Sequence, residues 1–150
     1  MILVMLGMVS SSTPRHLVVL SHGLHGCRHD LTYLAKALES YGCLVLKSSG
    51  NEYLESHNGI EEGAKRLATE VKSLKDLHPS LTHISLVGNS LGGLYCRFAI
   101  KELFDPDSGL VAGLHPLNFM VSTSFSSDYL IVVFPAVLKN NYTGMYSDYR

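Results

Sequence analysis

The sequence has few cysteines, no cluster of basic residues and no apolar run long enough to cross a bilayer. Its three cysteines, Cys27, Cys43 and Cys96, are widely spaced and odd in number. This argues against a disulfide framework or a cysteine-based metal site and favours a reducing compartment. The net charge is −1 and the lysines and arginines are dispersed, so the charge gives no support to nucleic-acid binding or electrostatic membrane docking. We therefore expect no nucleic-acid partner and no metal.

The N-terminal segment is apolar but short. Residues 1–9 lack a preceding basic region and are too few to span a membrane. A degenerate signal peptide fits them, and a loosely packed strand or frayed tail fits them better. We expect residues 1–15 to form a tail and the protein to be cytoplasmic, with peripheral membrane contact left open.

The rest of the chain alternates between patterns typical of strands and of helices. With 150 residues, 46% of them hydrophobic, it can bury the core of one domain. Short apolar runs predict four strands, and amphipathic stretches between them predict helices. The expected strands are residues 16–21, 43–47, 83–87 and 117–121, and the expected helices are 31–41, 60–74 and 94–104. This alternation predicts an α/β fold, a parallel sheet flanked by helices on both faces.

Residues 88–93 carry the clearest chemical motif. They read Gly-Asn-Ser-Leu-Gly-Gly and lie between an apolar strand pattern and a helical stretch. A G-x-S-x-G sequence in that context is typical of a nucleophile elbow, which exposes a serine on a sharp turn. Gly88 and Gly92 would flank Ser90 because side chains there would clash with the neighbouring elements. The backbone N–H of Leu91, at the start of the helix, would point toward a developing oxyanion.

A second glycine-containing motif follows the first predicted strand. Residues 22–26 read His-Gly-Leu-His-Gly, and serine hydrolases place the other half of the oxyanion hole in such a loop. We expect the N–H of Leu24 to be the donor, with Gly23 and Gly26 allowing the backbone to turn. A glycine-rich turn that happens to contain histidines is the alternative. Neighbouring Cys27 is interpreted as a small buried residue rather than a nucleophile.

Together these segments resemble the α/β-hydrolase superfamily, and more narrowly its lipase-like serine esterases, first grouped as a domain of unknown function. The segments that carry the resemblance are residues 16–26, 58–60, 66–68, 88–100 and 113–119. It implies that residues 16–121 form the N-terminal part of an α/β-hydrolase fold. It also implies a carboxylester or lipid-ester hydrolase that acts without a cofactor, through an acyl-enzyme on Ser90, within a Ser–His–Asp triad.

The resemblance ends after Met120, and residues 122–150 are expected to form a divergent tail. Relatives continue with further strands that carry the catalytic acid and histidine, in the chain order serine, acid, histidine. The one histidine after Ser90 is His115. It precedes the strand expected at 117–121, so it should lie at the opposite edge of the sheet from Ser90.

Other candidates for the base and the acid lie elsewhere in the sequence. Ligands of open parallel sheets bind at the edge formed by the carboxyl ends of the strands, and Ser90 and the loops after the strands at 16–21 and 43–47 are expected there. His22, His25 and His57 belong to these two loops. His22 matches the oxyanion loop of the family, and the other two are interpreted as solvated loop residues. Asp128 follows the last recognisable strand, where some hydrolases place the acid, but it falls in the divergent tail and a solvated loop aspartate fits that position better. The chain is therefore expected to be catalytically incomplete as given.

Two functions from different classes follow from these observations. One is a serine esterase or lipase-like hydrolase of ester or lipid substrates. The other is a non-catalytic product, a truncated isoform, pseudoenzyme or interaction module that retains the fold. A third interpretation, a phosphate-binding turn at residues 88–93, is disfavoured because no G-x-G-x-x-G or G-K-[ST] pattern is present.

Overall fold

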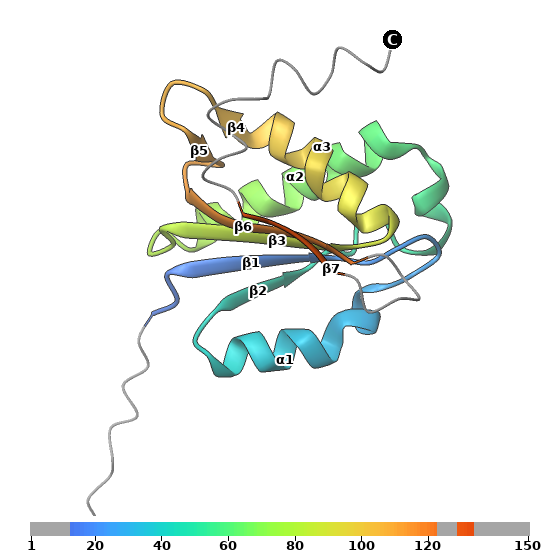
Figure 1. Cartoon of the computed structure of the whole chain (residues 1–150), viewed down its shortest axis with the longest axis horizontal. Helices are drawn as coiled ribbons and strands as arrows, with labels where there is room; N and C mark the ends of the chain where they lie inside the picture. Colours follow the sequence, from blue (N-terminus) through green and yellow to red (C-terminus); the bar gives the residue numbers. More distant parts are fainter. Residues whose placement is uncertain (1–12, 123–128, 134–150) are drawn as a thin grey trace, which may run out of the picture.

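The structure, a computed structural model, describes residues 13–122 and 129–133. A sheet with the strand order β2-β1-β3-β6-β7 lies at its centre (Figure 1). The strands are β1 (His16–Ser21), β2 (Leu44–Lys47), β3 (His83–Asn89), β6 (His115–Ser122) and β7 (Tyr129–Val133). The first four run parallel, and β7 pairs antiparallel with β6. A small antiparallel pair, β4 (Phe104–Asp105) and β5 (Leu110–Val111), lies outside this sheet.

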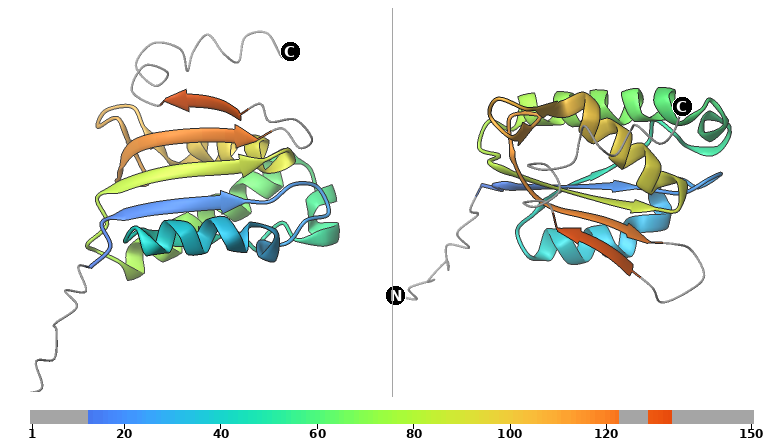
Figure 2. Two further views of the ribbon diagram at one scale, coloured as in Figure 1. Left: turned by 60° about the horizontal axis from the view of Figure 1, so that its bottom comes forward. Right: turned by 45° about the horizontal axis from the view of Figure 1, so that its top comes forward.

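Helices cover both faces of the sheet, as Figure 2 shows. On one face lies α1 (Thr32–Ser40), and on the other lie α2 (Ile60–Leu77) and α3 (Leu91–Leu103). Two short 3₁₀ helices, η1 (Arg28–Leu31) and η2 (Tyr53–His57), follow β1 and β2. The predicted fold class, a parallel sheet flanked by helices, is confirmed.

The burial pattern of β1 explains why its sequence is continuously apolar. Leu17 and Val19 pack into the larger core with α2 and α3, whereas Val18 and Leu20 pack into the smaller core with α1. A strand with helices on both faces has no solvated side, so alternation with polar residues is lost. Helix α2 shows the complementary pattern, because its buried positions Ala64, Leu67 and Val71 recur at spacings of three and four.

The elements agree with the sequence predictions in type and differ at their ends. Helix α3 begins at Leu91, three residues before the predicted start, and α2 continues to Leu77. Residues 48–58, between the predicted strand at 43–47 and the predicted helix at 60–74, contain η2. Strand β6 is longer than predicted, and the sheet is mixed rather than wholly parallel because β7 joins it antiparallel.

The chain reverses its direction across the sheet at β1. From β1 it moves to β2 on one side through α1, and from β2 it returns past β1 to β3 through α2. The carboxyl ends of β1 and β3 therefore lie next to each other at a topological switch point. Ligands of open α/β sheets bind in such a crevice, and both predicted motifs follow these two strands.

Several expectations concern residues near the ends of the chain. The described residues do not include most of the predicted N-terminal tail. They also do not include residues 123–128, among them Asp128, or residues 134–150. Within the described part, none of the helices has both the length and the apolar composition needed to cross a bilayer.

Candidate active site

Ser90 lies at the sharp turn between β3 and α3. Its backbone has φ +52° and ψ −120°, a conformation that L-residues rarely adopt, and the residue is exposed. Two backbone hydrogen bonds hold the turn: Ser90 N–H donates to Ser122 C=O (2.7 Å), and Gly93 N–H donates to Ser90 C=O (2.9 Å). The turn thus presents a serine hydroxyl to solvent at the carboxyl end of the sheet, as a nucleophile elbow does.

Glycines 88 and 92 allow the turn to pack closely against its neighbours. A Cβ at Gly88 would overlap the backbone at residues 92 and 93, at the start of α3. A Cβ at Gly92 would overlap the carbonyl oxygens of Ser21 and His22. These overlaps involve backbone atoms, which cannot rotate away, so the helix can approach β1 only through a glycine at position 92.

The loop after β1 lies directly against Ser90. A Cβ at Gly23 would be 3.3 Å from Ser90 Cβ and 3.2 Å from Asn89 O, so two segments distant in sequence meet here. The loop closes through a hydrogen bond from Gly26 N–H to Gly23 C=O (3.1 Å). A Cβ at Gly26 would lie 2.7 Å from Asp30 Oδ2 and 3.1 Å from Gly23 O, so a side chain there would displace the Asp30 carboxylate and crowd the turn.

Leu24 and Leu91 both have available backbone donors. Among the described residues, neither N–H has a hydrogen-bond acceptor. The Leu91 amide belongs to the first turn of α3, where the helix leaves its N–H groups unpaired and the macrodipole favours negative charge. The Leu24 amide is in the loop that contacts Ser90. The arrangement can therefore offer two N–H groups to an oxyanion beside the serine.

His22 is enclosed within the loop architecture. It is 1% exposed, and its Nδ1 contacts Gly23 O at 3.0 Å, which makes Nδ1 the protonated nitrogen because a carbonyl only accepts. Its Nε2 is buried without a partner among the described residues. The ring therefore supports the turn, in line with the role expected for the first histidine of the motif.

Among the described residues, no histidine or acidic side chain is hydrogen-bonded to Ser90. His115 begins β6 and pairs in register with His83, the first residue of β3, so it lies about 20 Å from Ser90 along the strand. His25 and His57 contact each other instead. In residues 13–122 and 129–133, the hydroxyl of Ser90 has no side-chain hydrogen-bond partner. Asp128 lies outside the described residues.

A network between α2 and the segment after β2 was missed in the sequence. Glu70 of α2 accepts hydrogen bonds from Ser48 Oγ (2.6 Å), Ser49 N and Oγ (2.9 and 3.0 Å) and Gly50 N (3.0 Å). These contacts hold the chain as it leaves β2, on the edge that carries Ser90. In the sequence Glu70 looks like an exposed helical acid; its periodic position gives no sign of this role.

Helix α3 also supports η2 through a buried tyrosine. The hydroxyl of Tyr95 donates to Ser56 C=O at 3.0 Å, and its ring packs where a Cβ on Gly63 would overlap it. Burial raises the pKa of Tyr95, outweighing the opposing effect of Arg66, so the hydroxyl remains a donor. Arg66 adds a bond from Nη2 to Glu55 C=O (2.8 Å). Helix η2 is therefore held by α2 and α3 at the same edge of the sheet as the two predicted motifs.

Cys27 lies beside this edge but is not fully buried as expected; it is half-buried. Its N–H donates to Asp30 Oδ2 at 2.9 Å, and its thiol lies 3.6 Å from Asp30 Oδ1. The thiol is thus next to a carboxylate rather than a cationic group, which does not favour a reactive thiolate.

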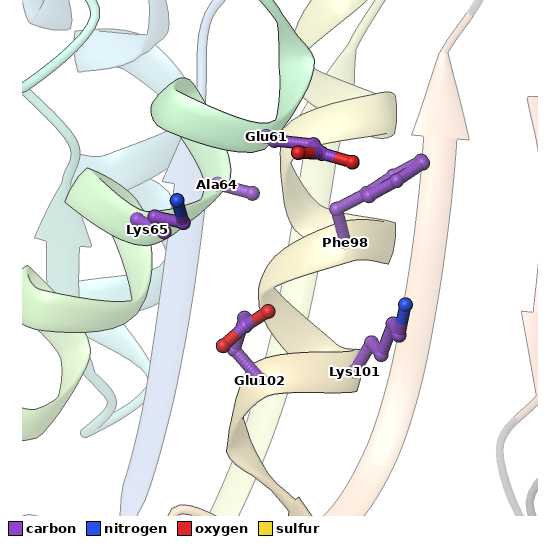
Figure 3. Close-up of a pocket in the computed structure, with 6 residues that line it drawn as sticks. All are labelled: Glu61, Ala64, Lys65, Phe98, Lys101 and Glu102. Carbon is purple, nitrogen blue, oxygen red and sulfur yellow. The ribbon is translucent and has the colours of Figure 1, made fainter.

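A small hollow of about 110 Å³ lies between α2 and α3 (Figure 3). Its lining residues are Glu61, Ala64, Lys65, Phe98, Lys101 and Glu102. Phe98 is seven residues beyond Leu91 along α3, a rise of about 10 Å. The hollow therefore belongs to the outer surface of the helical layer and not to the candidate active site.

Comparison with known proteins identifies the protein family to which this chain belongs. The model of the family described as "putative serine esterase (DUF676)" matches residues 11–139. The chain belongs to this family of serine esterases, as its sequence resemblance indicated.

Two curated fungal proteins are similar to this chain. The "putative lipase ROG1" of Saccharomyces cerevisiae is 34% identical over 127 residues, which cover 77% of this chain and 18% of that protein. The "putative lipase C4A8.10" of Schizosaccharomyces pombe is 30% identical over 116 residues, covering 70% and 15%. The chain therefore spans less than a fifth of the length of either relative.

The chain is also similar to a solved structure, an extracellular α/β-hydrolase from a Paenibacillus species. That protein is described as sharing structural and functional homology with tobacco salicylic acid binding protein 2. It is 18% identical, with a TM-score of 0.43, over 60% of this chain and 36% of that chain.

Proposed function

We propose that Ser90 is the nucleophile of a carboxylester or lipid-ester hydrolase that works through an acyl-enzyme. The observation that carries the proposal is the convergence of three features: an exposed serine on a strained turn, the unpaired Leu24 amide and the unpaired Leu91 amide. Membership of the serine esterase family supports the same reaction class.

The chemistry follows from these positions. The oxygen of Ser90 attacks the ester carbonyl carbon and loses its proton to a base, while the carbonyl oxygen becomes an oxyanion. The Leu24 and Leu91 amides donate hydrogen bonds to that oxyanion; one such donor is worth about 100- to 1,000-fold in kcat. Collapse of the tetrahedral intermediate expels the alcohol and leaves an acyl-serine. Water then attacks the acyl carbon, releasing the acid and restoring the serine.

No described side chain is hydrogen-bonded to the Ser90 hydroxyl, so the described residues offer no base already paired with it. A site with an oxyanion hole but no working triad retains roughly 1,000- to 10,000-fold acceleration over water, whereas efficient enzymes reach about a million-fold or more. The proposal of full catalysis therefore concerns a protein that contains this segment and supplies a histidine to Ser90. The absence of a described partner for the Ser90 hydroxyl equally favours a second candidate, a non-catalytic module that retains the fold.

Exposed apolar side chains around the site support a lipid-like substrate and contact with a lipid surface. Leu24 is 54% exposed, Tyr53 60% and Leu54 77%. The segments that carry them are joined by the hydrogen bond from Tyr53 N–H to Gly26 C=O (3.1 Å). Because the loop that carries Leu24 lies against Ser90 and is joined to the segment of Tyr53 and Leu54, these side chains could contact the acyl part of an ester that reaches Ser90.

Chemical rescue of the missing base tests the reaction. The 150-residue chain and its Ser90→Ala variant are assayed with p-nitrophenyl acetate at increasing imidazole concentrations. We expect the difference between the two proteins to be small without imidazole and to grow as imidazole is added, because imidazole can take the serine proton. Equal rates at every concentration, with both proteins folded, would favour the non-catalytic module.

The substrate class is tested by the length of the acyl chain. In a catalytically active longer form, Leu54→Asp should lower turnover of long-chain esters while leaving that of the acetate ester nearly unchanged. Binding of the same two proteins to neutral phospholipid vesicles, measured by sedimentation, tests the surface contact. Equal chain-length profiles and equal vesicle binding would argue against both roles of this apolar edge.

A further inference from the structure

Two histidines from different segments meet at the edge of the sheet that carries Ser90. His25 belongs to the loop after β1, and His57 is the last residue of η2. Their Nε2 atoms lie 2.5 Å apart, and their ring centroids are 4.6 Å apart with a tilt of 52°. Both residues are exposed. We propose that His25 and His57 form a binding site for a divalent transition-metal cation that links the two segments.

The geometry suits a shared cation. The two Nε2 atoms are in direct contact on exposed side chains, and imidazole nitrogen is a preferred ligand of zinc, copper and nickel. Two nitrogens bound about 2.0–2.1 Å from one ion lie roughly 2.9 Å apart at a right angle and roughly 3.4 Å apart at the tetrahedral angle. From their contact distance of 2.5 Å the two nitrogens would need to separate by about 0.4–0.9 Å, which exposed side chains can do. A hydrogen bond between them instead requires one protonated and one bare Nε2, and its net value is small in water.

The backbone holds the two histidines together before any ion arrives. His25 N–H donates to Ser56 Oγ (3.2 Å), next to His57, and the Tyr53–Gly26 hydrogen bond joins the same segments. The hydroxyl of Tyr95 donates a hydrogen bond to the carbonyl oxygen of Ser56 and so fixes that residue in place. Little ordering is therefore required on binding, which favours affinity.

The site has two protein ligands and is completed by water. Among the described residues, no group of three or more histidine, cysteine, aspartate or glutamate side chains is arranged to hold a metal. Binding should therefore be reversible, and copper should bind more tightly than nickel or zinc. An ion here would stiffen the loop that contains Leu24. Metal binding does not depend on the role of Ser90, whereas an effect on hydrolysis rests on the proposed function.

The test is a titration of the untagged 150-residue chain with Cu²⁺ and with Ni²⁺, followed by calorimetry. The electron paramagnetic resonance spectrum of the Cu²⁺ complex should show two coordinated imidazole nitrogens. Loss of an outer-shell partner alone costs about 10- to 100-fold in metal affinity, so His25→Asn or His57→Asn should cost at least as much. The double variant should be no weaker than either single one, because each change already removes the shared coordination.

Two control variants distinguish this site from other metal-binding groups. His115→Asn breaks a different histidine pair, His83–His115, at the opposite edge of the sheet. The ring centroids of that pair are 5.6 Å apart. Cys27→Ser removes the nearest thiol. Both should bind Cu²⁺ and Ni²⁺ as the unmodified chain does. The proposal is overturned if the unmodified chain binds neither ion, if the His25 and His57 variants bind with unchanged affinity, or if a control variant loses affinity equally.

Discussion

Ser90 combines a chemical group with a backbone conformation that costs free energy. A non-glycine residue in a rarely populated region is destabilised by about 1–3 kcal/mol, and Ser90 at φ +52° is held there by contacts on both sides. The sequence pattern predicted the sharp turn because glycine, serine and glycine recur at the spacing that the elbow needs. The strain itself became visible only with the backbone angles.

Ser90→Gly and Ser90→Ala together measure this strain. Both remove the hydroxyl, but only glycine adopts the observed angles without a Cβ penalty. We expect Ser90→Gly to be more stable than Ser90→Ala by about 1 kcal/mol, after allowing for the greater freedom of glycine in the unfolded chain. Urea unfolding followed by circular dichroism gives the difference. A glycine variant less stable than the alanine variant would contradict a strained turn.

Neighbouring glycines at the start of α3 should differ in their tolerance of alanine. A Cβ at Gly92 meets backbone oxygens, whereas one at Gly93 meets the side chain of Val121. Overpacking costs about 1–3 kcal/mol where the surroundings adjust, and a side chain adjusts more easily than backbone. We therefore expect Gly92→Ala to lower the unfolding midpoint in urea more than Gly93→Ala; the reverse order would argue against close packing of α3 on β1.

At the level of elements, one carboxylate holds the segment that leaves β2. Glu70 accepts hydrogen bonds from two serine hydroxyls and two backbone amides. Each hydrogen bond to a charged group makes a net contribution of about 1.5–3 kcal/mol to stability. Glutamine would place its own amide N–H donors against some of the donors that now face the carboxylate. Glu70→Gln should therefore loosen residues 48–50.

Hydrogen exchange measures this local effect. The Ser49 and Gly50 amides should exchange faster in Glu70→Gln, while amides in the centre of β3 should change less. Glu62→Gln is the matched control, since Glu62 lies on the same helix and, within residues 13–122 and 129–133, its ion pair is with exposed Lys65. Equal protection of Ser49 and Gly50 in both variants would show that Glu70 does not hold the segment.

The elements that the sequence predicted best are those whose apolar spacing directly reflects burial. The strands with continuous apolar runs and the amphipathic helix at 60–74 were predicted because packing against two layers dictates those patterns. The start of α3 was placed too late because Leu91, Gly92 and Gly93 have no helical periodicity, and glycine disfavours helices. Helix η2 was missed because contacts from Tyr95 and Arg66 support it, and these depend on the tertiary fold.

For the molecule as a whole, topology determines which residues form the site. The sequence predicted that the loops after β1 and β3 share one edge, because carboxyl ends of parallel strands lie together. It could not predict the contact between His25 and His57, which depends on how two loops lie relative to each other. Nor could it predict the antiparallel pairing of β7 with β6, since an apolar run has no inherent direction.

A pH dependence of global stability follows from His16 at the opposite edge. Burial, and secondarily the proximity of His83, lowers the pKa of His16 from its ordinary value of 6.5. Its Nε2 contacts Ser85 Oγ at 2.9 Å. Between the folded and unfolded pKa values the unfolded chain binds more protons, so the free energy of unfolding falls as the pH drops below about 6.5.

Urea midpoints measured between about pH 5.5 and 7.5 test this expectation. The unmodified chain should lose stability on acidification, and His16→Gln, which cannot titrate, should show a smaller loss. Comparison of the two slopes isolates His16 from the other histidines. Parallel slopes would mean that His16 does not contribute to the acid sensitivity.

The nucleophilic role of Ser90 is tested most directly by fluorophosphonate labelling of a native extract. Immunoreactive species are captured with an antibody to residues 16–120, and mass spectrometry locates the adduct. We predict an adduct on the peptide that contains Ser90, in a species longer than 150 residues, and its loss when Ser90→Ala replaces the natural protein. If every immunoreactive species stays unlabelled while other serine hydrolases in the same extract react, Ser90 is not an active nucleophile and the esterase assignment fails.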